Sequence, residues 1–543
     1  MAKDMQSSKL KSIISKCDLI KKGSPSCYKL TTTTDIVGTL RRVTFGKKNP
    51  SKPNKTILLV GETGAGKSSL INALVNYTMG VKWEDEVWFK IVVDKNQSQF
   101  QSQTSDVILY EVFDFENKTL PYSLTIIDTP GYGNTQGIEH DVIVSQRLFD
   151  LFRSQEGFHE IDVVGLVVRA SECRLNDRFV YILNSVMSLF GKDLEKNIVT
   201  LITYSNGVTP VNVLQALEAA NIKCARNEKN VPLHFLFDNC QHQDRTKQRG
   251  NLQHAHEISA QGMRQFTDFL ENITPQKLET TVEVMKEHIR LTACIQNLQD
   301  RLMLIALKQA ELKQTQQALK KYEQEMKMNK EFEVEVNEPY KDKERINGGM
   351  WGLFFFEGAV CCTFCEENCH YPGCTMAWKP EHCEVIKDGR CTACTRKCLA
   401  SAHSKEKYIY VTKTKKVQKT LIDVKEKYEK SKAASVDASS LLDDLQKEIE
   451  NLEADKEKWI DMACQHVDRL NKIALKVDSV STYVHLDFLI EKMKEKGDTE
   501  KLRTLKRQAN LVNEIVRSGV KYAYVGLCKI FSKNNDNKVY TNV

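Results

Sequence analysis

The stretch TILLVGETGAGKSSLINALVNY (residues 56–77) decides the fold of this 543-residue chain. A strand-like apolar run, 56–60, precedes a glycine-rich loop of the form G-x-x-x-x-G-K-[ST], and a helical pattern follows the loop. This order of strand, loop and helix is the structural context of a phosphate-binding loop. The glycines let backbone amides point at phosphate oxygens, and the helix N-terminus adds the positive end of its dipole. The stretch therefore predicts nucleotide binding.

The loop itself supplies most of the expected nucleotide contacts. Lys67 is expected to reach the β- and γ-phosphates, and the Ser68 hydroxyl to hold Mg²⁺. The nucleotide-binding candidates in the loop are Gly61, Glu62, Thr63, Gly64, Ala65, Gly66, Lys67, Ser68 and Ser69.

A second motif, DTPG at 128–131, closes the apolar run 123–129. It predicts Asp128 near the metal and the Gly131 amide near the γ-phosphate, a pattern that favours GTPases over motor or transporter ATPases. Between the two motifs, Thr104 is the candidate switch threonine, and the alternative is a threonine at a strand edge. The expected Mg²⁺ ligands are Ser68, Thr104 and Asp128.

Around these motifs, residues 31–275 alternate strand-like runs with helical stretches, which predicts an α/β domain with a doubly wound sheet. The candidate strands are 56–60, 106–112, 123–129, 163–168, 198–203 and 232–237. Residues 1–30 precede this domain as an N-terminal segment.

Heptads begin after Pro275. In 276–330 they run through Leu291, Ile295, Leu298, Leu302, Ile305, Leu312 and Leu319, and in 416–475 through Val417, Leu421, Val424, Tyr428, Ala438, Leu442, Leu445, Ile449, Leu452 and Trp459. Two matched arms predict an antiparallel coiled-coil hairpin; the alternative is a helical bundle folded back on the α/β domain. Alternating runs at 331–336 and 407–413 predict a β-ribbon within the intervening segment 331–415, and residues 476–543 are expected to form a C-terminal helical segment.

The intervening segment carries an internal repeat. CTFCEENCHYPGC (362–374) and CTACTRKCLASAH (391–403) share the same spacing of metal-ligating residues, with histidine replacing the last cysteine. Paired CxxC steps suit tetrahedral Zn²⁺, and we expect two structural zinc ions in a small module at the tip of the hairpin. The expected zinc ligands are Cys362, Cys365, Cys369, Cys374, Cys391, Cys394, Cys398 and His403.

Other interpretations of the cysteine segment remain open. The two halves could each close on one ion or exchange ligand pairs, and free or redox-active cysteines are the alternative to zinc. Cys361, Cys383, His370 and His382 are left over, and a buried thiol or a surface histidine is the simplest role for them.

The motifs GETGAGKSS, DTPGYG, VVRASECRL, SLFGKDLEKNIVTLIT and FLFDN resemble the paraseptin branch of GTPases, which holds septins, GIMAP proteins and chloroplast import receptor GTPases. The chain is most similar to animal members with a coiled coil and a Cys/His-rich insert. The resemblance implies GTP and GDP as ligands and a nucleotide-controlled switch that pairs through its G domains as a homodimer or larger oligomer.

The chain departs from that family pattern in two places. Where the guanine-reading aspartate would stand, it has Asn206, which offers one carbonyl acceptor and a donor amide, and Asn239 stands where the resemblance implies a later base-binding loop. Tyr132 follows DTPG, so the glutamine that orients water in small GTPases is absent. The resemblance therefore implies guanine preference and slow hydrolysis, with no catalytic residue named.

Composition narrows the function further. A net charge of +7 among 149 ionisable side chains (78 + 71) gives no reason to expect nucleic acid, and the start of the chain lacks the apolar core of a secretory signal. We expect a cytoplasmic switch whose zinc tip contacts a protein partner or a membrane surface. The alternatives are a RING-like ubiquitin ligase or adaptor and a DNA-tethering coiled-coil ATPase.

Overall fold

The computed structural model describes most of the chain in two compact units. The first comprises Met1–Met285, Asn471–Asp487 and Arg503–Val543, and the second comprises Lys286–Leu470 and Phe488–Leu502. The described residues are 10–37, 40–93, 107–113, 115, 119–132, 138–154, 158–171, 177–326, 333–346, 350–351, 355–356, 358–371, 373–374, 379–420, 438–476, 480–496, 502–503 and 505–506.

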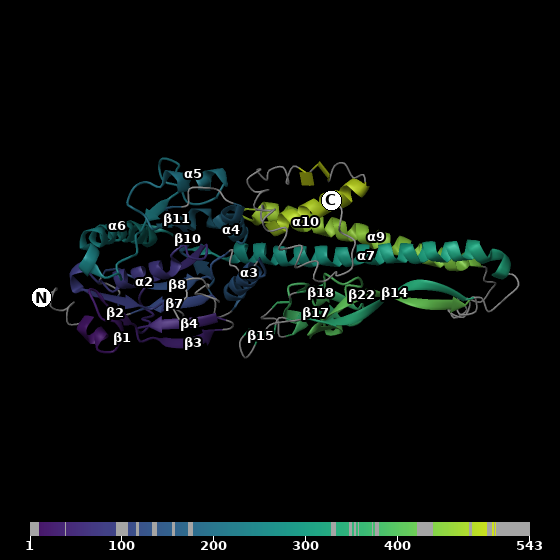
Figure 1. Ribbon diagram of the computed structural model, residues 1–543, viewed down its shortest axis with the longest axis horizontal. Coiled ribbons are helices and arrows are strands. Elements are labelled where there is room, and N and C mark those ends of the chain that lie inside the picture. Colours follow the sequence, from purple (N-terminus) through teal and green to yellow (C-terminus); the bar gives the residue numbers. More distant parts are fainter. Residues whose placement is uncertain are drawn as a thin grey trace. The chain divides into compact units, whose positions relative to one another are not determined.

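An eight-stranded sheet forms the centre of the first unit (Figure 1). Its strands, in spatial order, are β12 (His234–Leu236), β11 (Ile198–Thr203), β10 (Val163–Arg169), β5 (Asn54–Gly61), β8 (Ser123–Asp128), β7 (Ile108–Val112), β4 (Leu40–Phe45) and β3 (Thr33–Val37). The first five are mutually parallel, and β7 runs antiparallel to β8. All six predicted strands are present, and the α/β fold is confirmed.

Two small sheets accompany it. β1 (Asp18–Lys21), β2 (Ser26–Lys29) and β6 (Val87–Lys90) form the first, and β9 (Glu160–Ile161) pairs with β13 (Gln276–Lys277) in the second. Because β2 pairs with β6, and Leu10 and Cys27 lie in the domain core, the N-terminal segment packs as part of this unit.

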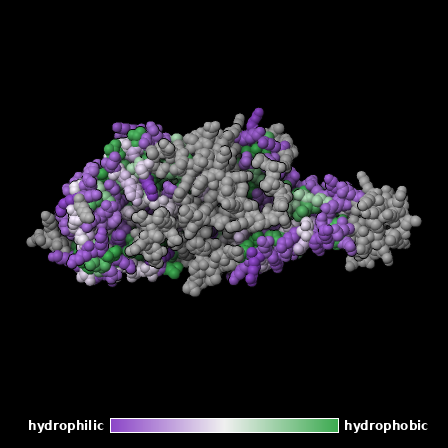
Figure 2. Space-filling model, viewed as in Figure 1, coloured by the Kyte–Doolittle hydropathy of each residue, from purple (hydrophilic) through white to green (hydrophobic). Residues whose placement is uncertain are grey.

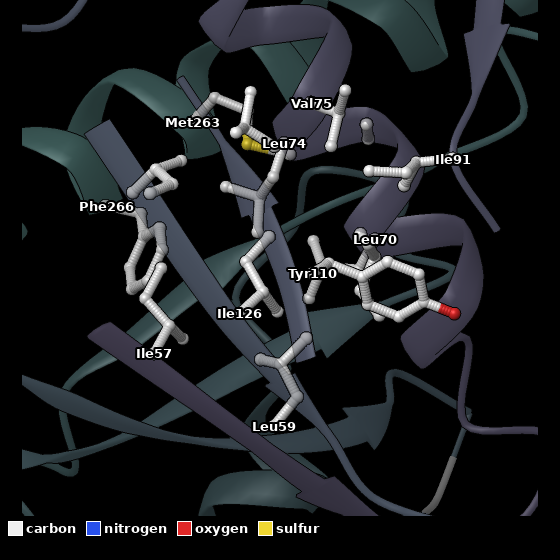
Figure 3. Close-up of a cluster of buried hydrophobic side chains, with 14 of the residues drawn as sticks. Ile57, Leu59, Leu70, Leu74, Val75, Ile91, Tyr110, Ile126, Met263 and Phe266 are labelled. Atoms are coloured by element: carbon white, nitrogen blue, oxygen red, sulfur yellow. The ribbon is translucent and has the colours of Figure 1, made fainter. Parts of the chain in front are cut away.

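Helices cover the sheet on both faces. They are α2 (Lys67–Thr78), α3 (Ile138–Arg153), α4 (Asp177–Met187), α5 (Val211–Ala219) and α6 (Arg245–Asn272), with 3-10 turns η1 (Trp83–Asp85) and η2 (Lys192–Asn197). Figure 3 shows side chains of α2 and α6 packed over the sheet, with Phe266 of α6 beside Ile57 of β5 and Leu70 of α2 beside Tyr110 of β7. Leu58 alternates to the opposite face and is equally buried. The strand that carries the phosphate loop is thus fixed on both sides.

The second unit is built on two antiparallel helices, α7 (Glu279–Met326) and α9 (Ala438–Ile473), which run side by side in Figure 1. Two contacts show that the helices run in opposite directions. The Cys294 thiol lies 3.5 Å from the Trp459 carbonyl, and Lys308, further along α7, forms an ion pair with Glu448, which comes earlier in α9. The two expected helical arms therefore exist, and their packing as a coiled coil stays a prediction. A further helix, α10 (Val480–Lys496), follows.

Between α7 and α9 in sequence lies a strand-rich module. Its long ribbon consists of β14 (Glu333–Arg345) and β22 (Tyr408–Thr420). Its short elements are β15 (Met350–Trp351), β16 (Phe355–Phe356), β17 (Ala359–Cys362), β18 (Glu367–His370), η3 (Pro380–His382), β19 (Ile386–Lys387), β20 (Arg390–Cys391), η4 (Ala400–Ala402) and β21 (His403–Glu406).

Two expectations about this unit are wrong. The cysteine module does not stand beyond the end of the helices, because Asn297 donates to the Asn368 carbonyl and Arg301 pairs with Glu367, so the module lies along α7. Val417, expected in the second arm, is in strand β22 opposite Val336. Leu421, Val424 and Tyr428 lie outside the described residues.

The described surface is mainly hydrophilic on the face shown in Figure 2, where hydrophobic residues occur in small patches. Among the described residues, no helix has the length and apolar character needed to span a membrane.

Candidate functional site

The carboxyl ends of β5, β8, β10 and β11 meet at one edge of the sheet, where ligands bind in open α/β folds. β5 runs into the phosphate loop, which ends at Gly66, the residue before α2. Gly66 has a φ of 93°, a backbone conformation that residues with a Cβ rarely adopt. The sequence-predicted loop is therefore in place at the N-terminus of a twelve-residue helix, as anion binding requires.

The Lys67 side chain is folded onto its own loop. Its Nζ donates to the carbonyls of Gly61 at 2.9 Å and Glu62 at 3.1 Å. Burial lowers the pKa of Lys67 to about 8, although the nearby charges of Asp128 and Glu62 raise it. A phosphate group would supply the negative charge that this buried ammonium lacks.

The DTPG segment is joined directly to the phosphate loop. The Thr63 hydroxyl donates to the Gly131 carbonyl at 3.1 Å, and the Tyr132 amide donates to the Gly61 carbonyl at 3.2 Å. A Cβ at position 131 would collide with the Thr63 backbone, so glycine is required at this close approach. The two predicted motifs therefore form one surface.

Two further residues hold the loop, and the sequence analysis missed both. The Thr203 hydroxyl donates to the Ala65 carbonyl at 2.6 Å, and Arg169 donates to the Gly64 carbonyl from Nε at 3.0 Å and from Nη2 at 2.7 Å. Each ends an apolar strand, β11 or β10, with a polar side chain at the edge where ligands bind. A polar residue at the carboxyl end of an apolar strand was the sequence signal that could have identified them.

The expected metal ligands are partly brought together. Asp128 is fully buried, and its charge influences the pKa of Lys67, so the carboxylate lies within range of the phosphate loop. Ser68 lies in the first turn of α2, beside Lys67. A carboxylate and a hydroxyl at this edge fit a Mg²⁺ ion. Thr104 lies outside the described residues.

The expected base-reading residues follow β11 and β12. Asn206 is exposed, and its Oδ1 accepts from the Val208 amide at 3.1 Å, so its only side-chain acceptor is engaged locally. Asn239 accepts from the Ser259 hydroxyl at 3.2 Å, and its buried Nδ2 has no hydrogen-bond partner among the described residues. Tyr204, 59% exposed, lies beside Gly66 with the Arg169 guanidinium 5.8 Å from its ring centre. A donor amide and an aromatic face suit recognition of a purine.

A second candidate site lies in the cysteine module. Its potential ligand atoms form three groups, and the atoms of each group lie within 4.8 Å of one another. The groups are Cys362, Cys365, Cys394 and Cys398; Cys369, Cys391, Cys394 and His403; and His370, Cys374 and Cys383.

All eight predicted ligands fall in these groups, together with His370 and Cys383. The halves of the repeat exchange ligands, since Cys362 and Cys365 meet Cys394 and Cys398. Cys374 does not join the first group, because the segment after β18 carries it to His370 and Cys383, two residues that sequence spacing left over. Cys361 remains a buried thiol, as expected, and burial raises its pKa to about 12.

Comparison with known proteins identifies the first unit's main segment. The AIG1 family model matches residues 55–282.

This segment is similar to the AIG1 family.

The match ends before the cysteine module, and no curated protein sequence matches the chain. Among solved structures, Toc33 from Arabidopsis thaliana in complex with Mg²⁺ and GMPPNP is 17% identical over 41% of this chain and 86% of its own, with a TM-score of 0.27. A second structure comes from work on dimerization and the GTPase activity of the chloroplast translocon components atToc33 and psToc159. It is 17% identical over 41% of this chain and 84% of its own, with a TM-score of 0.29.

Proposed function

We propose that the chain is a GTP-binding switch protein whose first unit binds GTP or GDP with Mg²⁺. The observation that carries the proposal is the union of the phosphate loop with the DTPG segment through Thr63 and Gly131. A switch needs the segment that senses the γ-phosphate to be mechanically continuous with the loop that holds the other phosphates. Here the hydrogen bonds from Thr63 to Gly131 and from Tyr132 to Gly61, with the close approach of the Gly131 and Thr63 backbones, provide that continuity.

Guanine selection rests on Asn239 and Asn206. The free Nδ2 donor of Asn239 suits a carbonyl acceptor such as guanine O6, whereas adenine carries an amino group at that position. Asn206 cannot accept two base N–H groups as an aspartate does, because its single Oδ1 already accepts from Val208. We therefore propose a preference for GTP that is weaker than an aspartate would give.

Hydrolysis is proposed to be slow. Tyr132 occupies the position after DTPG, is fully buried, and donates its amide to the Gly61 carbonyl. A buried phenol held by its backbone does not orient a water molecule at the γ-phosphate as a glutamine does.

Self-association through the G domain is supported by exposed apolar residues next to the base loop. Tyr204, Val208 and Val211 are 59%, 66% and 54% exposed. They lie within eight positions of Thr203, which is hydrogen-bonded to the phosphate loop, so a bound nucleotide would order the surface that carries them. The second unit, with its helix pair and cysteine module, is proposed as a scaffold for a protein partner or a membrane surface.

Titration of the purified full chain with fluorescent GTP and ATP, with molar mass followed by light scattering in each state, tests the proposal. We expect GTP to bind more tightly than ATP and the mass to rise with a non-hydrolysable GTP analogue. Lys67→Ala should abolish binding, and Lys192→Ala, which alters an exposed lysine bonded to the Asn471 carbonyl, is the matched control. Tight ATP binding with GTP ignored would overturn the base assignment, and an unchanged mass would remove self-association alone.

A further inference from the structure

One thiol in the cysteine module belongs to two ligand groups. Cys394 lies within 4.8 Å of the sulfurs of Cys362, Cys365 and Cys398, and also within 4.8 Å of the ligand atoms of Cys369, Cys391 and His403. The ligand atoms of a tetrahedral Zn²⁺ with four thiolates stand about 3.8 Å apart, given Zn–S distances of about 2.3 Å. One tetrahedral ion binds four such ligands, and two separate ions would need eight. The two groups together contain seven residues, because Cys394 belongs to both.

We propose that the module binds three metal ions of the zinc class: two that share the Cys394 thiolate as a bridge, and a third held by His370, Cys374 and Cys383. A thiolate sulfur has lone pairs for two metal ions, so seven ligands complete two tetrahedra when one of them is shared. This arrangement differs from two separate four-ligand sites, and it follows from positions rather than from spacing.

Distances within the groups match metal edges. The sulfurs of Cys365 and Cys398 are 3.7 Å apart, close to the edge of a zinc–thiolate tetrahedron. In the third group, His370 Nδ1 lies 3.2 Å from the Cys383 sulfur and 3.4 Å from the Cys374 sulfur, and the two sulfurs are 3.9 Å apart. An S–Zn–N edge is about 3.5 Å with the same bond lengths. The third group and one edge of the first group thus already have the spacing of a metal site, and the ligand atoms of the second group lie within 4.8 Å of one another.

Backbone amides around the shared group point at sulfur. Cys365 donates to the sulfur of Cys362 at 3.3 Å, Cys394 to that of Cys391 at 3.3 Å, and Cys398 to that of Cys394 at 3.1 Å. Such donors stabilise thiolates over thiols and orient them as ligands. The shared residue, Cys394, is among the sulfurs supported in this way.

His403 is oriented by its other nitrogen. Its Nδ1 lies 2.9 Å from the Leu399 carbonyl, which fixes the proton on Nδ1 and leaves Nε2 with its lone pair. Nε2 is buried and has no hydrogen-bond partner among the described residues. A buried acceptor aimed at three cysteine sulfurs is explained by coordination of a metal ion.

Charge also fits a two-ion cluster. Six thiolates outweigh two divalent cations, so the cluster is an anion, and Lys397 interacts electrostatically with Cys391 and Cys394 from the same loop. The ammonium of Lys397 donates to the Thr392 carbonyl and stands 4.1 Å from the centre of the Trp459 ring. A half-buried cation next to the shared thiolate compensates part of the excess negative charge.

The third group supplies three ligands instead of four. His370, Cys374 and Cys383 are buried, at 6%, 1% and 2% exposure, and two thiolates with one neutral imidazole balance one divalent cation. Three protein ligands leave one position of the tetrahedron to a solvent molecule or an anion.

Metal counting on the full-length chain tests the proposal. Elemental analysis and native mass spectrometry should give three zinc ions per chain. Cys383→Ala should remove one and leave the pair, whereas Cys394→Ala should remove both members of the pair and leave one. Cys361→Ala is the matched control, because it deletes a buried thiol of the same module that belongs to no group, and it should retain three. One or two ions in the wild type, or no loss with Cys383→Ala, would overturn the proposal.

A measurement on the wild type covers the case in which these variants fail to fold. The chain loaded with ¹¹³Cd should show three cadmium resonances, two of them split by coupling through one shared sulfur and the third unsplit. Three unsplit resonances would exclude the bridge. Fewer than three would exclude the stoichiometry.

Discussion

The guanidinium of Arg169 holds the carbonyl oxygen of Gly64 with two nitrogens, Nε at 3.0 Å and Nη2 at 2.7 Å. This contact ties the middle of the phosphate loop to the end of β10. Arg169 is therefore a positioning residue of the loop. Because its side chain is solvent-exposed, the contact is worth less than a buried charged hydrogen bond.

Arg169→Ala should weaken GTP binding about fivefold, corresponding to about 1 kcal/mol for a partly screened charged hydrogen bond. The GTP affinity of Arg169→Lys should lie between those of the wild type and Arg169→Ala, since an ammonium keeps the charge but cannot make both hydrogen bonds to the Gly64 carbonyl. Equilibrium titration with fluorescent GTP measures the effect. Arg226→Ala is the control, because that guanidinium pairs with Glu218 outside the loop. Equal losses in both variants would contradict the role of Arg169.

Affinity for GTP should fall as the pH rises above about 8. In the nucleotide-free protein Lys67 has a pKa of about 8, so it loses its proton above that pH, and binding phosphate requires the proton to be taken up again. The loss approaches tenfold per pH unit above the pKa. Titrations at pH 7, 8 and 9 measure it, and Lys67→Arg should bind more weakly at pH 7 but vary less with pH. Identical profiles would show that Lys67 is not the titrating group.

Asn206→Asp should strengthen GTP binding about tenfold, a change of about 1.4 kcal/mol, and leave ATP binding unimproved. The new carboxylate can still accept from the Val208 amide while its second oxygen accepts from the base. Asn227→Asp is the control. Asn227 Oδ1 accepts from the Lys229 amide in the same kind of local turn, and the substitution adds the same charge. A gain for both nucleotides would point to a general electrostatic effect instead.

Glu287 is expected to hold the two long helices together. Its carboxylate accepts from His466 and Arg290 and pairs with Arg469. Burial raises the pKa of Glu287, but these partners outweigh burial and lower it to about 2. Glu287→Gln should destabilise the helix pair by about 3 kcal/mol near pH 6, because the guanidinium groups of Arg290 and Arg469 lose a buried charged partner.

The difference in stability between the wild type and Glu287→Gln should disappear at low pH. A carboxylate with a lowered pKa contributes its full stability above its unfolded value near 4.5, and loses it as the pH falls toward 2. Hydrogen exchange of residues 286–326 and 445–470 at pH 6, 4 and 3 follows the effect. The exposed Glu450→Gln, which alters a carboxylate on the same helix α9, should change little at any pH.

Removing metal with a chelator should unfold the cysteine module while GTP binding by the first unit survives. A small module with few apolar contacts depends on its ions for folding. Hydrogen exchange should rise in residues 359–406, and fluorescent GTP titration should be unchanged within about twofold, since a factor of two corresponds to only about 0.4 kcal/mol. Loss of GTP binding on chelation would show that the two units are coupled.

The sequence predicted the part of the fold that depends on local pattern. The six predicted strands were found from their apolar runs, and the loop at 61–69 was found from its motif. The strands before Asn54 were missed, since β2 exists through pairing with β6 some 60 positions later, and no pattern within residues 26–29 announces that partner.

The arms and metal ligands show the same limit. Val417 fits a heptad and also an alternating strand, and its pairing with Val336 decided in favour of the strand. Spacing selected eight candidate cysteine and histidine ligands, but it could not show that Cys374 turns toward His370 or that Cys394 belongs to two groups. Arg169 was missed because a single arginine ending a strand carries no motif.

The position of the module along α7 also bears on synthesis at the ribosome. Asn297 and Arg301 contact residues 367–368, which emerge well before α9 begins at Ala438. During synthesis, α7 could thus contact the cysteine module before α9 has been made. If the module binds zinc as proposed, zinc supply during translation would decide whether Asn297 and Arg301 find their partners at that stage.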